Sequence, residues 1–288
     1  DVDGTSSVSL VSSFLNNHTK NNVLTYIPDR YQEGYGISTK SIDYAVSKEI
    51  NLIIALDCGI QAIDKVEYAK GKNIDFIICD HHRPSKEIPK AIAVLNPLRE
   101  DCQYPFKDLC GCGIGFKLIQ GLSSRMGEAI ESIKEYLDLV ALAIVADIVS
   151  LTGENRILCY YGLEQINQSP RPGLKAIIDT LDKDNITINE LGFYIGPRIN
   201  AAGRMESGNI AVELLIEKDL DKASGLAEKL NQLNIERRVL DKETTQDALN
   251  QIKKFKNETS HTTVVCNPEW HKGVIGITAS KLIETYYR

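Results

Sequence analysis

The sequence lacks any run of about 18 apolar residues, the length that a helix needs to cross a membrane. It also lacks the basic stretch followed by an apolar one that marks a secretory signal peptide. We therefore expect a cytoplasmic protein with no membrane partner. Three common catalytic patterns are missing as well: the G-x-S-x-G elbow, the Walker A lysine loop, and G-x-G-x-x-G after the first strand. These absences argue against serine hydrolases, P-loop enzymes and dinucleotide-binding enzymes.

Cysteines in a regular, paired spacing are missing too. There are seven cysteines, an odd number. Cys102, Cys110 and Cys112 cluster, but they lack a nearby fourth ligand and the paired spacing of a zinc site. We therefore interpret the cysteines as reduced thiols of a cytoplasmic protein.

What the chain does contain is an ordinary globular composition. Of its 288 residues, 43% are hydrophobic and 25% are charged, and 39 acidic against 33 basic side chains give a net charge of -6. This length suffices for about two domains. Acidity by itself disfavours a protein that holds duplex DNA by uniform positive charge.

The first half of the chain alternates short apolar runs with helical patterns. The apolar runs, predicted as buried strands, are residues 23–27, 52–56, 76–79 and 91–95. The helical patterns between them are residues 5–15, 38–49 and 62–70, the second with Ser38 as its N-cap. This alternation predicts an α/β fold with a parallel sheet flanked by helices, in which ligands bind beyond the carboxyl ends of the strands.

The second half of the chain is mostly helical. Residues 136–149 form a strongly apolar helix in this interpretation, and the Gly- and Asn-rich residues 189–208 form a loop. Apolar residues then recur every three or four positions over 219–257, which predicts one long connector helix or two in series. Residues 262–266 are expected to be a strand and 273–287 a helix.

Acidic and imidazole side chains stand where the predicted strands end. Asp57 follows the second strand, and Asp80, His81 and His82 follow the third. The carboxyl ends of neighbouring parallel strands face one crevice, so these side chains should converge. Each group also has a simpler interpretation, as a strand end, a turn or a capping residue.

Three further carboxylates extend this set. Asp1 and Asp3 precede the first predicted helix, and Asp147 lies within the apolar helix, where a charge is costly unless it is paired or bound to metal. Carboxylates crowd together only when cations neutralise them. Oxygen ligands with one or two imidazoles suit two Mn²⁺ or Mg²⁺ ions, which could activate water and hold a phosphoryl group.

These residues resemble the DHH phosphoesterase superfamily, whose defining triplet is Asp80-His81-His82 here. The resemblance is closest to the RecJ-like family of single-strand-specific 5′→3′ exonucleases. The further stretches that carry it begin at residues 27, 104, 153, 196 and 270, and read IPDRYQEGYG, YPF, GENR, GPRINAAGR and WHKGVIG. Together they cover nearly the whole chain.

The resemblance implies a two-metal site. Asp3, Asp57, His81 and Asp147 would hold one ion, and Asp1 and Asp57 the other, so that Asp57 bridges them. His82 would lie beside the scissile phosphate, and Asp80 would orient a histidine. The family's first motif begins with a histidine four residues before the position of Asp1, so we expect this motif to be incomplete here.

The resemblance also implies a nucleic-acid site. Arg30 and Tyr35 lie in the loop that would meet the 5′ end of the strand, with a guanidinium for phosphate and a ring for a base. The other implied nucleic-acid residues are Arg198, Asn200 and Arg204, in the predicted Gly-flanked loop, and His271. Solvated loops are the simpler interpretation of both segments.

We accordingly expect a DHH catalytic domain over residues 1–218, a connector helix over 219–257 and the beginning of a DHH-associated domain over 258–288. The resemblance implies a metal-dependent exonuclease for single-stranded DNA, acting in DNA repair and recombination, with a single-strand-binding protein and a helicase as partners. Two alternatives stay open: a superfamily phosphoesterase for short oligonucleotides, cyclic dinucleotides or pyrophosphate, and a catalytically impaired scaffold that binds nucleic acid.

Overall fold

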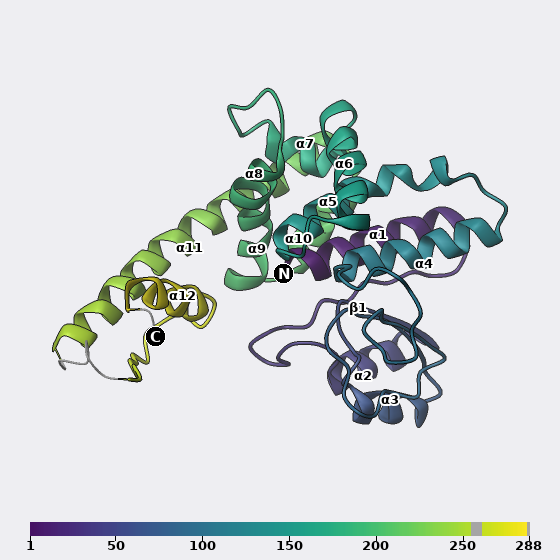
Figure 1. Cartoon of the computed structure of the whole chain (residues 1–288), viewed down its shortest axis with the longest axis horizontal. Coiled ribbons are helices and arrows are strands. Elements are labelled where there is room, and N and C mark those ends of the chain that lie inside the picture. Colours follow the sequence, from purple (N-terminus) through teal and green to yellow (C-terminus); the bar gives the residue numbers. More distant parts are fainter. Residues whose placement is uncertain (255–260, 287–288) are drawn as a thin grey trace.

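The computed structural model describes residues 1–254 and 261–286 (Figure 1). Its strands are β1 (Leu52–Leu56), β2 (Asp75–Cys79) and β3 (Ala93–Leu95). The helices of the first half are α1 (Val2–His18), α2 (Thr39–Ser47), α3 (Ile63–Lys70), α4 (Gly111–Arg125), the 3₁₀ helix η1 (Ile130–Tyr136) and α5 (Leu137–Ala146). Those of the second half are α6 (Gly153–Gln168), α7 (Pro172–Ile178), α8 (Ile188–Glu190), the π-helix η2 (Leu191–Ile195), α9 (Gly196–Met205), α10 (Asn209–Ile216), α11 (Leu220–Lys254) and α12 (Ile275–Tyr286).

The strands form a parallel sheet in the order β1-β2-β3. Successive side chains of a strand point to opposite faces, and both faces are covered by helices. Phe76 and Ile78 pack with the residues of α2 and α3, whereas Ile77 and Cys79 pack with the larger helical core on the other face. Figure 1 shows α2 and α3 on one side of the sheet and α1 and α4 on the other. The expected α/β architecture is confirmed.

Helix α1 lies at the centre of the helical layer, where it contacts α4, α5 and α10. It is rich in small hydroxyl residues, and most of those on its buried face, Ser6 excepted, bond to the helix's own carbonyls. Ser7 Oγ donates to the Asp3 carbonyl at 2.7 Å, and Ser9 Oγ donates to the Thr5 carbonyl at 2.8 Å. These bonds satisfy hydroxyls that would be costly to bury unpaired, so neighbouring helices can approach α1 closely.

Helix α11 is one continuous helix of 35 residues, which corresponds to about 52 Å at 1.5 Å per residue. It packs against α7, α9 and α10 near its beginning and against α12 near its end (Figure 1). The predicted connector helix is therefore present as a single helix. Its predicted end at residue 257, and the start of the next domain at 258, lie outside the described residues. No helix in the part of the chain described here is long and apolar enough to cross a membrane.

Two predicted strands are wrong. Residues 23–27 form no strand, and Ile27 packs against Gly208 at the start of α10. Residues 262–266 are also irregular and pair with no strand of the described chain. Both segments have the side chains that are typical of a half-buried strand. Such side chains favour a strand only where they can pack against a neighbouring strand, and a local pattern does not show whether one is present.

The predicted loop over residues 189–208 is also wrong, because α8, η2 and α9 occupy most of it. Two of its glycines allow close packing: a Cβ on Gly192 would lie 3.2 Å from Val145 of α5, and one on Gly196 would lie 3.1 Å from the Leu191 carbonyl oxygen. The first helix begins at Val2, earlier than predicted, so Asp3 lies inside it. The apolar helix ends at Ala146, so Asp147 is its C-cap and not an interior residue.

Candidate metal centre and nucleic-acid interface

Asp57 directly follows β1 at the carboxyl end of the sheet. Its backbone N–H donates to the Cys79 carbonyl at 2.9 Å, which extends the β1–β2 pairing to this residue. Its φ is 60°, a left-handed conformation that costs a residue other than glycine about 1–3 kcal/mol. The strand pairing holds Asp57 in this conformation, which turns its carboxylate into the crevice.

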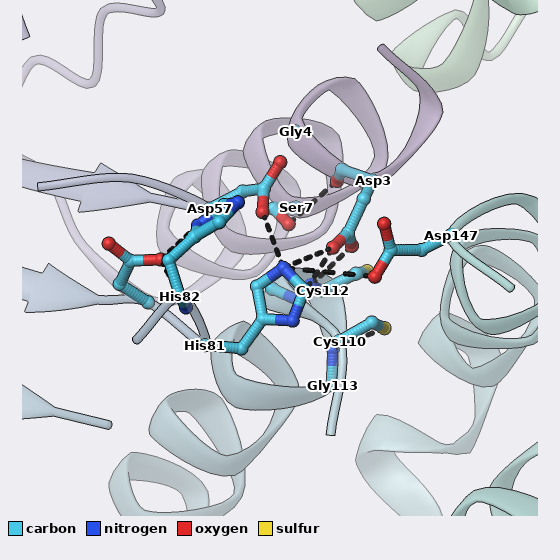
Figure 2. Close-up of polar contacts among 12 residues, drawn as sticks. Asp3, Gly4, Ser7, Asp57, His81, His82, Cys110, Cys112, Gly113 and Asp147 are labelled. Carbon is cyan, nitrogen blue, oxygen red and sulfur yellow. Dashed lines mark hydrogen bonds and ion pairs between the residues drawn. The ribbon is translucent and has the colours of Figure 1, made fainter. Parts of the chain in front are cut away.

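His81 follows β2 and is the centre of the cluster, as Figure 2 shows. Its Nε2 lies 3.1 Å from Asp57 Oδ1, 3.6 Å from Asp3 Oδ2 and 3.7 Å from Asp147 Oδ2. These residues come from the ends of two strands, from α1 and from the end of α5. The predicted convergence of strand ends is confirmed, and the structure adds the two helices that supply Asp3 and Asp147.

The beginning of helix α4 holds the carboxylate of Asp3. The backbone N–H of Gly111 donates to Asp3 Oδ2 at 2.6 Å, and that of Cys112 donates to Oδ1 at 2.7 Å. Unpaired N–H groups and the helix dipole make a helix N-terminus favourable for an anion. Both oxygens of the buried Asp3 are therefore fixed in place before any ligand binds.

Asp80 and Asn96 position His82 in the same way. Asp80 Oδ1 lies 2.7 Å from His82 Nδ1, and Oδ2 accepts the Ile60 N–H at 2.8 Å. The Asn96 side chain donates to the His82 carbonyl at 2.9 Å. The carboxyl of Asp80 is 1% exposed, whereas the ring of His82 is 58% exposed. His82 thus presents Nε2 outward from a fixed ring, and Asp80 is placed to orient it.

The crowded acids change each other's protonation. Burial, and then the charge of Asp57, raise the pKa of Asp3 above its usual range. Burial also raises the pKa of Asp147. Burial opposes a charge on His81, but the hydrogen bond to Asp57 and the charges of the surrounding carboxylates raise its pKa overall. Such a cluster holds protons that a cation can replace.

The donor set fits divalent cations. Two groups of side chains have ligand atoms within 4.8 Å of one another: Asp57, His81 and His82, and then Asp3, His81 and Asp147. Apart from His81 Nε2 at 3.1 Å, the buried Asp57 Oδ1 has no hydrogen-bond partner among the described residues, so it keeps lone pairs available for an ion. Carboxylate oxygens with imidazole favour Mn²⁺ or Mg²⁺, and the cysteines of the described chain contribute no ligand group.

The expected assignment of metal ligands stays a prediction, and the geometry differs from it in two respects. Asp1 belongs to neither group; its carboxylate caps α1 by accepting the Gly4 N–H at 3.1 Å. A Cβ on Gly4 would lie 3.6 Å from Asp1 Oδ1 and 3.4 Å from Asp57 Oδ2, so the two carboxylates line the same spot. The side chain common to both groups is His81, whereas the resemblance implies Asp57 as the bridge.

Gly111 permits the close contact between α4 and the centre. A Cβ at this position would lie 2.6 Å from Asp57 Cβ and 2.8 Å from Asp57 Oδ1. Carbon atoms ordinarily stay about 3.5–4.0 Å apart. Only a residue without a side chain therefore lets the helix N-terminus reach Asp3 while Asp57 keeps its position.

The predicted nucleic-acid residues of the 30–36 loop gather with Arg204 and His271. The Arg30 guanidinium lies 5.2 Å from the ring centroid of Tyr35, which is 80% exposed. Tyr31 connects this loop to Arg204 and His271. Its hydroxyl donates to the Arg204 carbonyl at 2.7 Å, and its ring packs edge to face against that of His271, with 6.0 Å between the ring centroids. A cation, an exposed ring and an imidazole thus lie at one place.

Arg198 and Asn200 lie on α9 and not in a loop, and they face different neighbours. Asn200 Oδ1 accepts the Val2 N–H at 3.1 Å, so it fixes the start of α1 beside the centre. Arg198 turns away toward α11, where its Nε donates to Asn231 Oδ1 at 3.2 Å. The structure therefore does not bring Arg198 together with Arg30.

Sequence reasoning missed the role of the Cys110-Gly111-Cys112 segment. It weighed the thiols as zinc ligands, whereas the backbone N–H groups hold the site. The signal was available, because a glycine-rich segment at the start of a helix is a typical anion-binding element. What the segment binds here is the protein's own Asp3.

A family model matches half of the chain. The family described as "DHH family, N-terminal domain" matches residues 1–144. Two curated relatives named single-stranded-DNA-specific exonuclease RecJ align with all of the chain. The one from Escherichia coli (strain K12) is 36% identical over 305 residues, and the one from Bacillus subtilis (strain 168) is 38% identical over 290 residues. The chain covers 52% and 36% of these two proteins, so it spans about half of their length or less.

A solved structure extends the similarity to three dimensions. The crystal structure of an exonuclease RecJ bound to manganese has a TM-score of 0.90 with this chain at 30% sequence identity. The match covers 100% of this chain and 72% of that one. The similarity therefore includes the α/β sheet, the helical layer and the long helix that follows them.

Proposed function

Since this chain belongs to the DHH family, we propose that it is the catalytic core of a RecJ-like exonuclease that hydrolyses single-stranded DNA from its 5′ end. The observation that carries the proposal is the pair of overlapping ligand groups around His81 at the carboxyl end of the sheet. Mn²⁺ or Mg²⁺ would be held by Asp3, Asp57, His81 and Asp147, with Asp1 and Asp57 at the second position. When bound, two such ions lower the pKa of water and neutralise charge on the phosphoryl group.

The chain's own residues prepare this chemistry. The N-terminus of α4 keeps Asp3 fixed, and the Asp57 conformation aims its carboxylate at the crevice. Asp80 fixes the ring of His82, so that Nε2 can donate to a phosphate oxygen. Preorganised groups of this kind need no rearrangement when charge develops on the phosphate.

The proposed reaction is hydrolysis of the phosphodiester next to the terminal nucleotide. A water oxygen bonds to phosphorus while the bond from phosphorus to the 3′ oxygen of the terminal nucleotide breaks. The products are a nucleoside 5′-phosphate and a strand with a new 5′-phosphate. Arg30 and Tyr35 would receive the 5′ end, with the guanidinium on phosphate and the ring on a base, and Arg204 and His271 complete this end of the site.

The experiment uses a single strand labelled at either end, with Mn²⁺. A 3′-labelled strand should shorten progressively, and a 5′-labelled strand should release its label as mononucleotide from the start. Asp57→Ala should abolish digestion, whereas Asp184→Ala, at an exposed acidic position, should digest normally. Digestion that survives Asp57→Ala refutes the proposal. Hydrolysis of dinucleotides without hydrolysis of long strands would favour the short-oligonucleotide alternative, and binding without hydrolysis would favour the scaffold.

The wider role is part of the same proposal. We assign residues 1–218 to the catalytic domain, 219–257 to the connector and 258–288 to the beginning of a DHH-associated domain. We infer a cytoplasmic enzyme of DNA repair and recombination, with a single-strand-binding protein and a helicase that exposes single strands as partners. Stimulation of digestion on a duplex by an added helicase tests the second partner, and co-purification tests the first.

A further inference from the structure

The carboxylate of Asp147 has no hydrogen-bond donor that fixes it at the metal centre. Figure 2 shows it directed toward His81 from the end of α5, with 3.7 Å between Asp147 Oδ2 and His81 Nε2. Among the described residues, no N–H or O–H group donates a hydrogen bond to this carboxylate. Asp3 differs, because two backbone N–H groups of α4 hold both of its oxygens. The position of the Asp147 carboxylate therefore depends on the backbone that carries it.

The residue after Asp147 has a strained backbone. Ile148 has a φ of 57°, which a β-branched residue rarely adopts. Its side chain is 89% exposed, so burial of that side chain does not hold the residue in this conformation. A strained conformation persists only where the surrounding structure fixes it. The contacts that fix Ile148 must therefore come from the residues that follow it.

Asn155 of α6 makes such a contact. Its side chain is fully buried, and its Nδ2 donates to the Ser150 carbonyl at 2.9 Å and to the Asp108 carbonyl at 2.7 Å. Both partners can only accept, so the nitrogen of the amide and not its oxygen faces them. Ser150 lies three residues after Asp147, and Asp108 lies three residues before the start of α4 at Gly111. One amide thus joins the two segments that lead to the metal centre.

The beginning of α6, which carries this amide, is itself fixed to its neighbours. Tyr104 Oη donates to Glu154 Oε2 at 2.7 Å, and Lys117 of α4 forms an ion pair with the other oxygen of Glu154. A Cβ on Gly153 would lie 2.7 Å from the ring of Phe106, so the two segments are also in close contact there. The YPF and GENR stretches therefore connect the segment before α4 to the beginning of α6.

The two segments that Asn155 joins line one pocket beside His81. The pocket has a volume of about 300 Å³, and its lining includes residues 107–109 from one segment, Val149 and Ser150 from the other, and His81 itself. The distance between the two segments therefore affects the width of the pocket next to the metal centre. The two hydrogen bonds of Asn155 fix that distance.

We propose that Asn155 is a positioning residue of the metal centre, which holds Asp147 in place by fastening Ser150 to the segment before α4. The inference rests on the metal centre of the proposed function and adds a residue that supports one of its ligands. Without the two hydrogen bonds, Ile148 relaxes from its left-handed conformation and carries the Asp147 carboxylate away from His81. The effect of Asn155 on metal binding therefore acts through Asp147.

The test measures Mn²⁺ affinity by calorimetric titration without substrate, on variants that unfold cooperatively in denaturant. Asn155→Ala removes both hydrogen bonds and should weaken Mn²⁺ binding by about 10–100-fold. Asn167→Ala is the control, because Asn167 lies near the other end of α6 and its Nδ2 likewise donates to two carbonyls, at 2.8 and 2.9 Å. This control should bind Mn²⁺ like the unmodified protein. If Asn155→Ala does not fold, Asn155→Ser keeps one hydroxyl donor and should give a smaller loss in the same direction.

Two combined variants separate positioning from packing. Asn155→Ala/Ile148→Gly should bind Mn²⁺ about fivefold more tightly than Asn155→Ala, because glycine adopts the left-handed conformation without strain. When Asp147→Ala is already present, Asn155→Ala should cause no further loss of Mn²⁺ affinity, because the ligand through which it acts is gone. A residue that only stabilised the fold would produce neither result.

The outcomes distinguish this inference from the proposed function. Equal Mn²⁺ affinities of Asn155→Ala and Asn167→Ala overturn the positioning role. So does a further loss when Asn155→Ala is added to Asp147→Ala, and so does Asn155→Ala/Ile148→Gly binding no better than Asn155→Ala. If the expected affinities are found but the unmodified protein digests no strand, the positioning role stands and the proposed function fails.

Discussion

The substitution Gly111→Ala tests how the metal centre is held. The new methyl group would lie 2.6 Å from Asp57 Cβ and 2.9 Å from Asp57 Cα. Both neighbours are close to the backbone, so no flexible side-chain end can move aside. Since carbon atoms ordinarily stay about 3.5–4.0 Å apart, α4 and Asp57 must separate by roughly 1 Å.

Such a separation affects both of the expected metal ligands that Gly111 contacts, Asp3 and Asp57. It lengthens the hydrogen bond from the Gly111 N–H to Asp3, now 2.6 Å, or it moves the Asp57 carboxylate. Changes in the groups that support metal ligands cost about 10–100-fold in metal affinity. A misplacement of roughly 1 Å can cost about 100-fold in rate. We expect Gly111→Ala to bind Mn²⁺ about 10–100-fold more weakly and to lose about 100-fold in strand digestion.

The assay is calorimetric titration with Mn²⁺, followed by digestion of a labelled strand at saturating metal. Gly121→Ala is the matched control, because it lies on the same helix with open space around the new methyl group. In that helix interior, alanine should raise the free energy of unfolding by about 0.5–1 kcal/mol and leave metal binding unchanged. The extra atom at Gly111 should instead lower the free energy of unfolding by about 1–3 kcal/mol.

The reasoning is refuted if Gly111→Ala binds Mn²⁺ and digests the strand like Gly121→Ala. That result would mean that the contact between α4 and Asp57 does not hold the ligands. A loss of stability with normal metal affinity would equally exclude the positioning role, because it would make the close contact a matter of packing only.

Three further predictions concern other parts of the chain. Arg171 forms a two-pronged ion pair with the buried Asp138, at 2.6 and 2.8 Å, so Arg171→Leu should lower the free energy of unfolding by about 3–5 kcal/mol in denaturant titrations. Replacing both partners by leucine should recover most of this loss, and a double variant as unstable as the single one would contradict the assignment. Cys266 is exposed, whereas burial raises the pKa of the core thiols. Alkylation at pH near 8 followed by mass spectrometry should therefore label Cys266 first. Early labelling of the core cysteines would contradict the packing. Asp80→Asn should slow digestion about 10–100-fold while the protein still binds Mn²⁺, since Asp80 orients His82; unchanged digestion would remove that role.

The sequence predicted the sheet and the residues of its carboxyl edge. The strand over residues 52–56 matches β1, and Ser38 is the N-cap of α2 as expected. Strand identity was accessible because buried parallel strands are short, continuous apolar runs. The helices over residues 189–208 were not accessible, because glycine favours loops locally and only packing against α5 shows why it stands in a helix.

The same distinction applies to the candidate site, because some of its residues could be placed from the sequence and others could not. Asp57, Asp80, His81 and His82 could be brought together from sequence, since the topology of a parallel sheet places its strand ends side by side. The position of Arg198 could not be predicted, because it depends on which face of α9 meets α11.

Sequence by itself determined the chemistry of this protein: which side chains can ligate a cation and which strand ends present them. The tertiary structure decided what holds those side chains, namely the N-terminus of α4 on Asp3 and the bare Gly111 beside Asp57. The physical reason is the separation along the chain. Strand ends and capping patterns are local in the sequence, whereas Asp3 and Gly111 are 108 residues apart and meet only when the core packs.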